Sequence, residues 1–339
     1  MIAVLFFIAL LASGVFTFLR RATLDGMIAR NRDLTARSEA LARGGVQLAT
    51  ALLLQDRLDE VESFPLDTRS DLWARLAEVE IPVPDGGRLR LRIEDAGSRL
   101  NLNALFDPDG NAHEDAEPFL TALLEKLIEE LKASGEAQDY DPAELARSLV
   151  DYVDANDFEE MGGGQEDDYY QLQSPPYRAA NRPLLSIDEL GLVEGFDRAL
   201  VDAIRPYATV HPYGNDPDSG DGIGINPNTA PAHVLALLFH GMAPDRRLAS
   251  EDDVRWILAT RDEDKAFCPQ SGGYGAVECE FLSDQTGAGL AGIYPPPRYT
   301  ANVFQVIAEA SYGDVRRTIE AVIDRSQPTT PMILSWRVR

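Results

Sequence analysis

The sequence is poor in cysteine, histidine and basic side chains. Its 339 residues include two cysteines and four histidines, and 31 Lys and Arg stand against 56 Asp and Glu, for a formal net charge of −25. Two cysteines exclude a small scaffold held by several disulfides and any metal site built from four cysteines. The acidic balance disfavours nucleic acid as a partner, because most of the surface repels phosphate. What is present is a chain that is 45% hydrophobic, enough for a substantial core.

The first 19 residues carry no charged side chain. This apolar run ends at Arg20 and Arg21 and, at about 1.5 Å per helical residue, spans about 28 Å, close to the hydrocarbon thickness of a bilayer. Two alternatives stay open: a secretory signal peptide, whose apolar region is usually shorter, and a buried helix of a soluble core. We interpret residues 1–19 as a transmembrane segment that anchors the protein.

A long helix is expected to follow this segment. Residues 22–58 contain no proline and are rich in Ala, Leu and Arg, which favour helices. The pair Gly44-Gly45 indicates either a bend or a place of close packing. Apolar residues at three- and four-residue steps predict an amphipathic stripe made of Leu24, Met27, Ile28, Leu34, Ala40, Leu41, Leu48, Ala51 and Leu52.

Strands are predicted on both sides of a long central region. Apolar and polar residues alternate over 88–95, and strand patterns recur at 302–313, 315–326 and 332–339. Three late strands in succession imply an antiparallel meander. We therefore expect an α+β domain whose sheet has one early and three late strands, with an insertion at about 105–297.

The insertion is acidic and helical in pattern. Residues 101–170 hold 20 Asp and Glu against three Lys and Arg, a net charge of −17. Periodicity predicts helices over 117–133 and 142–152. Two later segments, 184–210 and 225–242, each combine a helix start, an apolar run and a glycine turn, as in paired helix-hairpin-helix units. We expect a mostly helical insertion in two small lobes.

Several separated motifs resemble one protein family. After the hydrophobic start and the Ala- and Arg-rich helix come GSRLNLNAL (97–105), LVDYVDANDFEEMGGGQEDDYYQLQSPPYRAANRPLLSIDELGLVEGF (149–196), RPYATV (205–210) and IGINPNTA (223–230). Their order is more specific than any single motif, and the similarity covers nearly the whole chain. The sequence is similar to the K subunits of the type II secretion system, a family of large minor pseudopilins also called general secretion pathway protein K.

This resemblance implies a pilin-like fold, in which a long N-terminal helix packs on an antiparallel sheet, with a large inserted, mostly helical domain of two SAM-like lobes. The expected parts are a transmembrane segment at 1–19, the first part of the pilin-like domain at 20–104, lobes at 105–212 and 213–297, and the second part of the pilin-like domain at 298–339.

The resemblance also implies a role. We expect a single-pass inner-membrane protein, mostly periplasmic, that caps or initiates the pseudopilus for export of folded proteins across the outer membrane. Its expected partners are the minor pseudopilins I and J, other pseudopilins, the inner-membrane secretion platform, a prepilin peptidase and secreted substrates. Family members begin with a basic leader ending in glycine, and Met1 here already lies in the apolar run, so we expect either such a leader upstream of Met1 or an altered export route. Arg20 and Arg21 alone would favour the opposite orientation.

An acidic loop at 154–168 is a candidate metal site. It combines carboxylates with three consecutive glycines, and Ca²⁺ takes about six to eight oxygen ligands. The residue order is not that of an EF-hand, here or at 107–118. The family's calcium binding, transferred to this loop, predicts the ligands Asp154, Asp157, Glu159, Glu166, Asp167 and Asp168. Residues 215–222 are a weaker candidate, and a merely solvated acidic loop is the alternative.

The two cysteines, Cys268 and Cys279, enclose ten residues rich in Gly and Ser. In the oxidising periplasm that the resemblance implies, we expect them to form a disulfide. Two free thiols in a reducing compartment are the alternative.

No catalytic motif stands out, and we expect no enzyme. The histidines form no HExxH motif, and the one close pair, His233 and His240, lies on one predicted helix. No G-x-S-x-G elbow is present, and no lysine follows the glycines at 162–164 to bind phosphate. The alternative function is a membrane-anchored helix-hairpin-helix protein that binds DNA through the glycine turns at 193–196 and 239–242, against which the missing basic cluster argues.

Overall fold

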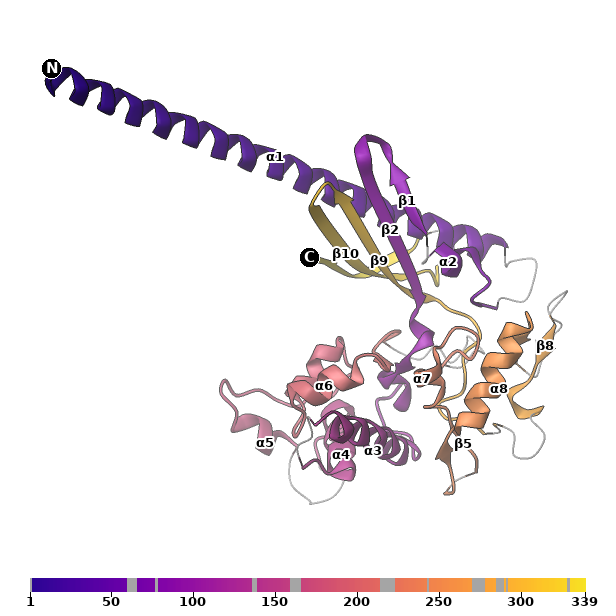
Figure 1. Cartoon of the computed structure of the whole chain (residues 1–339). Coiled ribbons are helices and arrows are strands. Elements are labelled where there is room, and N and C mark those ends of the chain that lie inside the picture. Colours follow the sequence, from indigo (N-terminus) through magenta and orange to yellow (C-terminus); the bar gives the residue numbers. More distant parts are fainter. Residues whose placement is uncertain are drawn as a thin grey trace.

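A long N-terminal helix and an antiparallel sheet form one layered unit, and a second unit of helices and short strands lies beyond one end of the sheet (Figure 1). The computed structural model describes residues 2–59, 66–76, 79–135, 139–158, 166–213, 223–242, 244–269, 278–284, 290, 292–327 and 330–339. The observed arrangement is the α+β, pilin-like architecture that the sequence predicts, with the insertion between the early and the late strands.

The elements follow one another along the chain as α1 (Ile2–Asp59), α2 (Leu72–Arg75), β1 (Glu80–Val83), η3 (Pro84–Gly86), β2 (Gly87–Asp95), η4 (Ala96–Ser98), β3 (Leu100–Asn101), η5 (Leu102–Leu105), α3 (Ala116–Ser134), α4 (Pro142–Val153), α5 (Asp167–Gln171), η6 (Ile187–Leu192), α6 (Arg198–Ile204), β4 (Ala208–Thr209), α7 (Ala232–Leu235), β5 (Phe239–His240), β6 (Arg247–Leu248), α8 (Glu251–Asp262), β7 (Ala266–Phe267), β8 (Cys279–Glu280), η7 (Leu282–Asp284), β9 (Val303–Tyr312), β10 (Val315–Asp324) and β11 (Met332–Val338).

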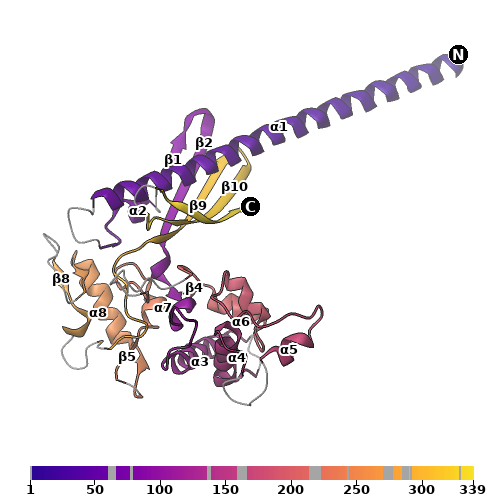
Figure 2. The same cartoon turned by 180° about the vertical axis from the view of Figure 1, so that it is seen from behind.

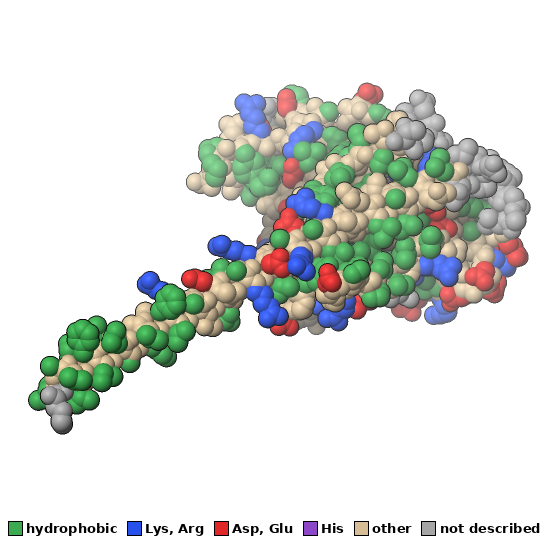
Figure 3. Space-filling view, turned by 90° about the horizontal axis from the view of Figure 1, so that it is seen from above, with side chains coloured by type: hydrophobic (Ala, Val, Ile, Leu, Met, Phe, Trp, Pro, Cys, Tyr) green, Lys and Arg blue, Asp and Glu red, His purple; other side chains and the backbone are tan. Residues whose placement is uncertain are grey.

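Helix α1 is one continuous element that joins the apolar segment to the sheet. It has 58 residues and a length of about 87 Å at 1.5 Å per residue. Its first part extends away from the rest of the molecule (Figure 2) and displays hydrophobic side chains along the visible face of its free end (Figure 3). Within the described ranges, α1 is the one helix long and apolar enough to cross a membrane. This agrees with the transmembrane segment expected at 1–19.

The buried face of α1 differs from the predicted stripe. The side chains that pack against the sheet are each at most 2% exposed: Ser38, Ala42, Val46, Ala49 and Leu53. The prediction was wrong for Ala40, Leu48 and Ala51, which lie on the exposed side. The sheet packs on the side of α1 where residues 38, 42, 46, 49 and 53 recur at three- and four-residue steps, and Ala40, Leu48 and Ala51 lie away from that side.

Gly45 accounts for the glycine pair in α1. A Cβ at Gly45 would lie 2.8 Å from Leu89 Cδ1 and 3.1 Å from Ala308 Cβ, whereas a Cβ at Gly44 would meet nothing within 4 Å. The helix continues through both residues. Close packing is therefore the correct interpretation of the pair, and the bend is wrong.

Five strands form the antiparallel sheet in the order β1-β2-β9-β10-β11. The strands predicted from the sequence are confirmed, and β9 pairs with β2 so that Leu91 lies opposite Ala308. The prediction of a single early strand was wrong, because β1 pairs with β2 across the turn at Pro84–Gly86. This strand has four residues, contains Pro82 and lies at the sheet edge, where a missing N–H is tolerated.

The two faces of the sheet differ in chemistry. Leu89, Leu91 and Ile93 of β2 are buried beneath α1 in one hydrophobic cluster with β9 and β10. Arg90 and Arg92 alternate with them and are exposed on the opposite face. We call this opposite side the outer face of the sheet. Period-two alternation assigns one side to the core and the other to solvent or a partner.

The insertion is helical in its first part and mixed in its second. Helices α3 and α4 match the predictions to within one residue at each end. The segment 225–242 differs, because α7 has four residues and His240 lies in strand β5. The second helix-hairpin-helix unit and the placement of His233 and His240 on one helix are therefore wrong. Periodicity alone does not distinguish a short apolar helix from a short strand.

One hydrophobic cluster runs through the whole insertion, from Leu100 to Tyr299. It contains buried side chains from both expected lobes, such as Leu120 and Leu235. The boundary at 212 is thus not a break in the hydrophobic core, and the division into two lobes stays a prediction. The sheet and α1 share a separate cluster of their own.

A buried arginine fastens the sheet to the end of α1. Arg325 follows β10 and is 0% exposed, and its guanidinium pairs with Asp67 at 2.7 Å and with Asp56 at 2.6 Å. It also donates to the carbonyl oxygens of Leu53 at 3.1 Å and Ala301 at 2.9 Å. Two carboxylates and two carbonyls offset the cost of burying this cation.

A buried carboxylate joins the insertion to the end of β2. Asp95 accepts hydrogen bonds from Gly97 N at 2.6 Å, Thr229 Oγ1 at 2.7 Å and Asn226 Nδ2 at 3.0 Å. Burial raises the pKa of Asp95, while these hydrogen bonds and Arg298 oppose the shift. Because Asn226 and Thr229 belong to the IGINPNTA motif, that motif serves to connect the two units.

We expect Arg325→Leu to lower the free energy of unfolding by about 3–5 kcal/mol, because Asp56 and Asp67 lose the buried cation. Urea unfolding of the full chain in detergent micelles, followed by tryptophan fluorescence, measures the change. The matched control is Arg316→Leu on β10, whose partner Glu309 lies 3.0 Å away but whose side chain is 68% exposed. The control costs less than about 1 kcal/mol. Equal losses in the two variants would contradict the role of Arg325.

Gly45→Leu is expected to destabilise the chain by about 1–3 kcal/mol, because the added side chain overpacks the contact with Leu89 and Ala308. Gly44→Leu is the control on the open side of α1 and is expected to stabilise by up to about 1 kcal/mol through helix propensity. The same urea titration compares them. A Gly45 variant as stable as the Gly44 variant would show that this contact is not tight.

Candidate functional site

In the described ranges, one group of three side chains can hold a metal ion. Asp151, Asp154 and Glu166 each offer a carboxylate oxygen, and these oxygens lie within 4.8 Å of one another. Asp151 and Asp154 are three residues apart at the end of α4 and lie on one side of it, while Glu166 precedes α5. Two predicted ligands thus come together. Asp151 is not among the ligands predicted from the sequence, although its spacing from Asp154 was a signal.

Glu166 is, with Asp154, one of the two buried members of this acidic cluster. Its side chain is 5% exposed, and neither carboxylate oxygen has a hydrogen-bond partner in the described structure. Burial, followed by the negative charges of Asp154, Asp151, Asp157 and Asp167, raises the pKa of Glu166 to about 8. A buried carboxylate with unsatisfied oxygens is stable when it holds a proton or contacts a cation.

Two other predicted ligands have polar partners elsewhere. Asp157 Oδ1 accepts a hydrogen bond from Asn181 Nδ2 at 3.0 Å. Asp167 Oδ1 accepts one from Ala179 N at 3.1 Å, and its other oxygen lies 3.6 Å from Arg178 Nε. Both carboxylates contribute to the negative field around Glu166. Their direct ligation of a metal stays a prediction.

The remaining predicted positions are not part of the acidic cluster. Asp168 is exposed on α5. Glu159 and the weaker candidate loop at 215–222 lie outside the described residues.

The chemistry of the cluster fits calcium. Its ligand atoms are carboxylate oxygens, which suit a hard cation, and it contains neither thiolate nor imidazole. The oxygens of Asp154 also accept hydrogen bonds from Asn156 N at 3.2 Å and Asn156 Nδ2 at 2.9 Å, which orient the carboxylate. A bound cation would compensate the charge of Glu166 and hold the end of α4 to the start of α5.

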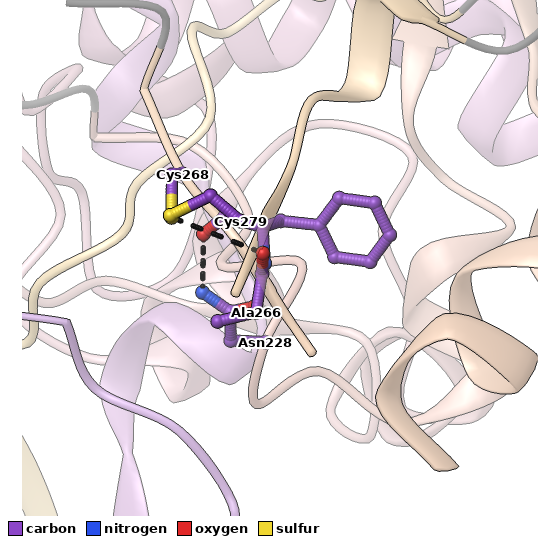
Figure 4. Close-up of a disulfide and its surroundings, with 5 residues drawn as sticks. Asn228, Ala266, Cys268 and Cys279 are labelled. Carbon is purple, nitrogen blue, oxygen red and sulfur yellow. Dashed lines mark hydrogen bonds between the residues drawn. A yellow bond between two sulfur atoms is a disulfide. The ribbon is translucent and has the colours of Figure 1, made fainter. Parts of the chain in front are cut away.

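The two cysteines form the disulfide expected from the sequence. Cys268 and Cys279 join the segment after β7 to β8, which pairs with β7 in parallel (Figure 4). Asn228 holds strand β7 next to the disulfide, since its Nδ2 donates to Phe267 O at 2.9 Å and its Oδ1 accepts from Phe267 N at 2.7 Å. The IGINPNTA motif therefore also holds the disulfide-bonded region.

Three of the histidines are described by their burial or by their packing on neighbouring rings. Burial lowers the pKa of His211 to about 4 and also lowers the pKa of His240, so both rings are neutral at pH 7. The ring of His113 stacks on Tyr294 with centroids 4.7 Å apart. The acidic cluster, the one candidate metal group of the described residues, includes no histidine.

The glycine turns do not form a DNA-binding pair. Gly195, at φ +80°, lies between η6 and α6, but Gly241 follows strand β5 and leads towards β6. Arg246, close to the second turn, already pairs with Asp115 at 3.1 Å and donates to Gly292 O at 2.6 Å. Phosphate binding requires cations free to contact the backbone, so the DNA-binding alternative is not supported.

Comparison with known proteins identifies the family. Residues 98–213 match the family described as type II secretion system protein K. The chain is 30% identical to type II secretion system protein K of Aeromonas hydrophila, over 90% of this chain and 86% of that protein. It is 28% identical to the protein of the same name from Pseudomonas aeruginosa, over 84% of this chain and 76% of that one.

A solved structure has the same fold. It is the crystal structure of the GspK-GspI-GspJ complex from the enterotoxigenic Escherichia coli type 2 secretion system, with a TM-score of 0.63 and 20% sequence identity. The likeness covers 92% of this chain and 99% of the matched chain. Together these findings confirm the resemblance drawn from the sequence: the chain belongs to the type II secretion system protein K family.

Proposed function

We propose that this chain is the minor pseudopilin that caps or initiates a type II secretion pseudopilus together with I- and J-type subunits. The observation that carries the proposal is the full-length likeness to a chain of the GspK-GspI-GspJ complex, in a family of secretion components. The protein acts as a structural part of the secretion apparatus. Contacts with the other pseudopilins, the inner-membrane platform, the prepilin peptidase and exported substrates belong to the same proposal.

We propose that the sheet and the insertion, which together we call the head, lie in the periplasm and that α1 crosses the inner membrane once. Two observations support this placement. The first part of α1, which extends beyond the sheet and which we call the stem, is long and apolar enough to span a bilayer. The head contains the Cys268–Cys279 disulfide, and disulfides persist in oxidising compartments.

The stem continues its apolar surface beyond Arg20 and Arg21. Leu24, Met27 and Ile28 are exposed on α1 before the helix reaches the sheet. An uncovered apolar patch on a membrane-proximal helix is typical of a packing surface. We propose that these three side chains pack against the helices of neighbouring pseudopilins.

Ile28→Asp is expected to reduce recovery of the I- and J-type subunits with the tagged chain at least about tenfold, because a charge enters the apolar contact. The measurement is co-purification of the full chain from membranes that also contain both partners. The control, Asn31→Asp, adds the same charge to an exposed residue of the same helix. Failure of the unaltered chain to recover either partner would overturn the proposed assembly.

We also propose that the acidic cluster of Asp151, Asp154 and Glu166 binds a structural Ca²⁺. The unpartnered, buried carboxylate of Glu166 supports this, since its pKa of about 8 reflects a site that lacks positive charge. The ordinary pKa of a glutamate is 4.5, and that of Glu166 in the folded chain is about 8. Between these two pH values the folded chain holds a proton that the unfolded chain releases. Without metal, stability contributed by Glu166 therefore falls as the pH rises through this range.

Added Ca²⁺ is expected to raise the thermal unfolding midpoint strongly at pH 8 and weakly at pH 5, because the ion binds the ionised carboxylates. Calorimetry at pH 7 should also detect proton release, through the dependence of the binding heat on the buffer. Glu166→Gln abolishes both effects, whereas Asp168→Asn, at an exposed position on α5, keeps them. An unchanged midpoint of the unaltered chain with Ca²⁺ at pH 8 would rule out the site.

A further inference from the structure

A cleft of about 640 Å³ lies between the outer face of the sheet and the first part of the insertion. Strands β2, β9, β10 and β11 form one wall, and η6 with residues 205–213 forms the other. In Figure 1 the C-terminus of the chain, which follows β11, lies on the side of the sheet that faces α6. Five arginines line this space, from both walls: Arg92, Arg99, Arg205, Arg337 and Arg339. We call it the arginine cleft.

The first two arginines share one carboxylate. Arg92 Nε lies 3.1 Å from Glu94 Oε1, and Arg99 donates through NH2 to Glu94 Oε2 at 2.7 Å. Arg99 also donates to Gln305 Oε1 at 3.0 Å. Asp95 lines the same space, but its carboxylate accepts three hydrogen bonds at the junction of the two units and has its own cation there, Arg298. At this end of the cleft two guanidinium groups thus share one carboxylate, which leaves a surplus of one positive charge.

The same excess recurs at the other end. Asp188 lies 2.7 Å from Arg205 and 3.7 Å from Arg337, so two guanidinium groups share one carboxylate. Arg339 pairs with Glu320 at 3.2 Å. Arg205 also lies 3.6 Å from Asp202, which itself pairs with Arg198 outside the cleft and adds no net charge.

The arginines of the cleft remain accessible. The side chains of Arg92, Arg205, Arg337 and Arg339 are 45–59% exposed. Each guanidinium carries five N–H donors, more than its present partners use. In a chain with a formal charge of −25, a cleft with surplus cations and unused donors is complementary to an anionic ligand. The pKa of Asp188, lowered by Arg205 and further by Arg337 and Arg339, agrees with a positive potential there.

Strand β11 gives this cleft a free backbone edge. It is the last strand of the five and pairs with β10 alone in the described structure. Arg339 N and O both bond Thr318, at 2.9 and 3.0 Å, so Arg339 belongs to a hydrogen-bonded pair. In an antiparallel ladder the residues alternate, which turns the N–H and C=O groups of Trp336 and Val338 outward. An unpaired edge of this kind accepts an additional strand.

The side chains of β11 divide in the same way as those of the sheet. Trp336 packs against the α1 cluster and lies 5.5 Å beneath the guanidinium of Arg43. Arg337 and Arg339, on the opposite side, point to the cleft. A strand added to β11 would therefore place every second side chain beside these arginines.

We propose that β11 and the arginine cleft together bind an extended acidic segment of another polypeptide, added to the sheet as a further strand. Its backbone pairs with the outward groups of Trp336 and Val338, and its carboxylates contact Arg337 and Arg339, the two arginines that β11 contributes to the arginine cleft. This surface is distinct from the apolar face of α1 that the proposed assembly uses. The inference therefore does not depend on the I- and J-type partners.

The test measures binding of a fluorescein-labelled peptide with the sequence Thr-Glu-Val-Glu-Val-Asp-Val-Glu-Thr to the full chain in neutral detergent, by anisotropy. We expect saturable binding that weakens as salt rises from about 50 to 300 mM. Arg337→Gln should weaken it at least about tenfold through loss of charge-assisted bonds. Val338→Pro removes one outward N–H without touching the bonds to β10 and should weaken it by a similar factor. Arg316→Gln, on the same face but outside the cleft, stays within about twofold.

Three results would overturn the proposal. They are absence of peptide binding, equal affinity of the Arg337 variant and the Arg316 control, and unchanged affinity of the Val338→Pro variant, which would exclude strand addition. A single-stranded oligonucleotide of equal charge serves as the competing anion, and preferential binding of that probe would identify a general anion site instead. Co-purification with the I- and J-type partners is measured in parallel, so a failure of peptide binding is distinguishable from a failure of the proposed assembly.

Discussion

The burial of one cation, the guanidinium of Arg325, fixes how the parts of the pilin-like unit meet. Its partners come from the end of α1, from the segment before α2 and from Ala301, just before β9. A charge in that position cannot lose a carboxylate without a large penalty, so these segments move as one body. Because α1 also extends beyond the sheet as the apolar segment, this network sets the direction of that segment relative to the sheet.

The close contact between α1 and the sheet follows a related constraint. Ser38, Ala42, Gly45 and Ala49 keep the contact side of α1 short, so that the aliphatic residues of β2 and β9 reach the helix backbone. Larger apolar residues of α1, such as Leu24 and Ile28, remain on its uncovered length. The helix thus uses small side chains to fold the chain and large ones where other chains can pack.

Charge is separated within the head in a way that suits a protein that works by contact. The acidic cluster at the end of α4 concentrates carboxylates around Glu166, which favours a cation. The arginine cleft on the outer face of the sheet has the opposite excess, which favours an anionic segment. Two neutral histidines, His211 and His240, and the disulfide-bonded segment serve packing. A secretion component that binds several neighbours in a fixed geometry needs surfaces of different chemistry on one rigid body.

The sequence by itself determined the elements whose signals are local. An uncharged run identified the stem, strict alternation identified β2, a repeated strand pattern identified the late meander, and helical periodicity identified α3 and α4. Asp154 and Glu166 were found because acids and glycines are dense in their loop.

Tertiary structure decided what depends on distant partners. The face of α1 that is buried was set by the sheet, β1 by pairing with β2, and the fate of 225–242 by packing in the insertion, which turned an apolar run into a short helix and a strand. Asp151 and the shared carboxylates of the arginine cleft became visible when the backbone brought separate segments within a few ångströms, because the energy of a charge depends on its neighbours in space and not on its neighbours in the chain.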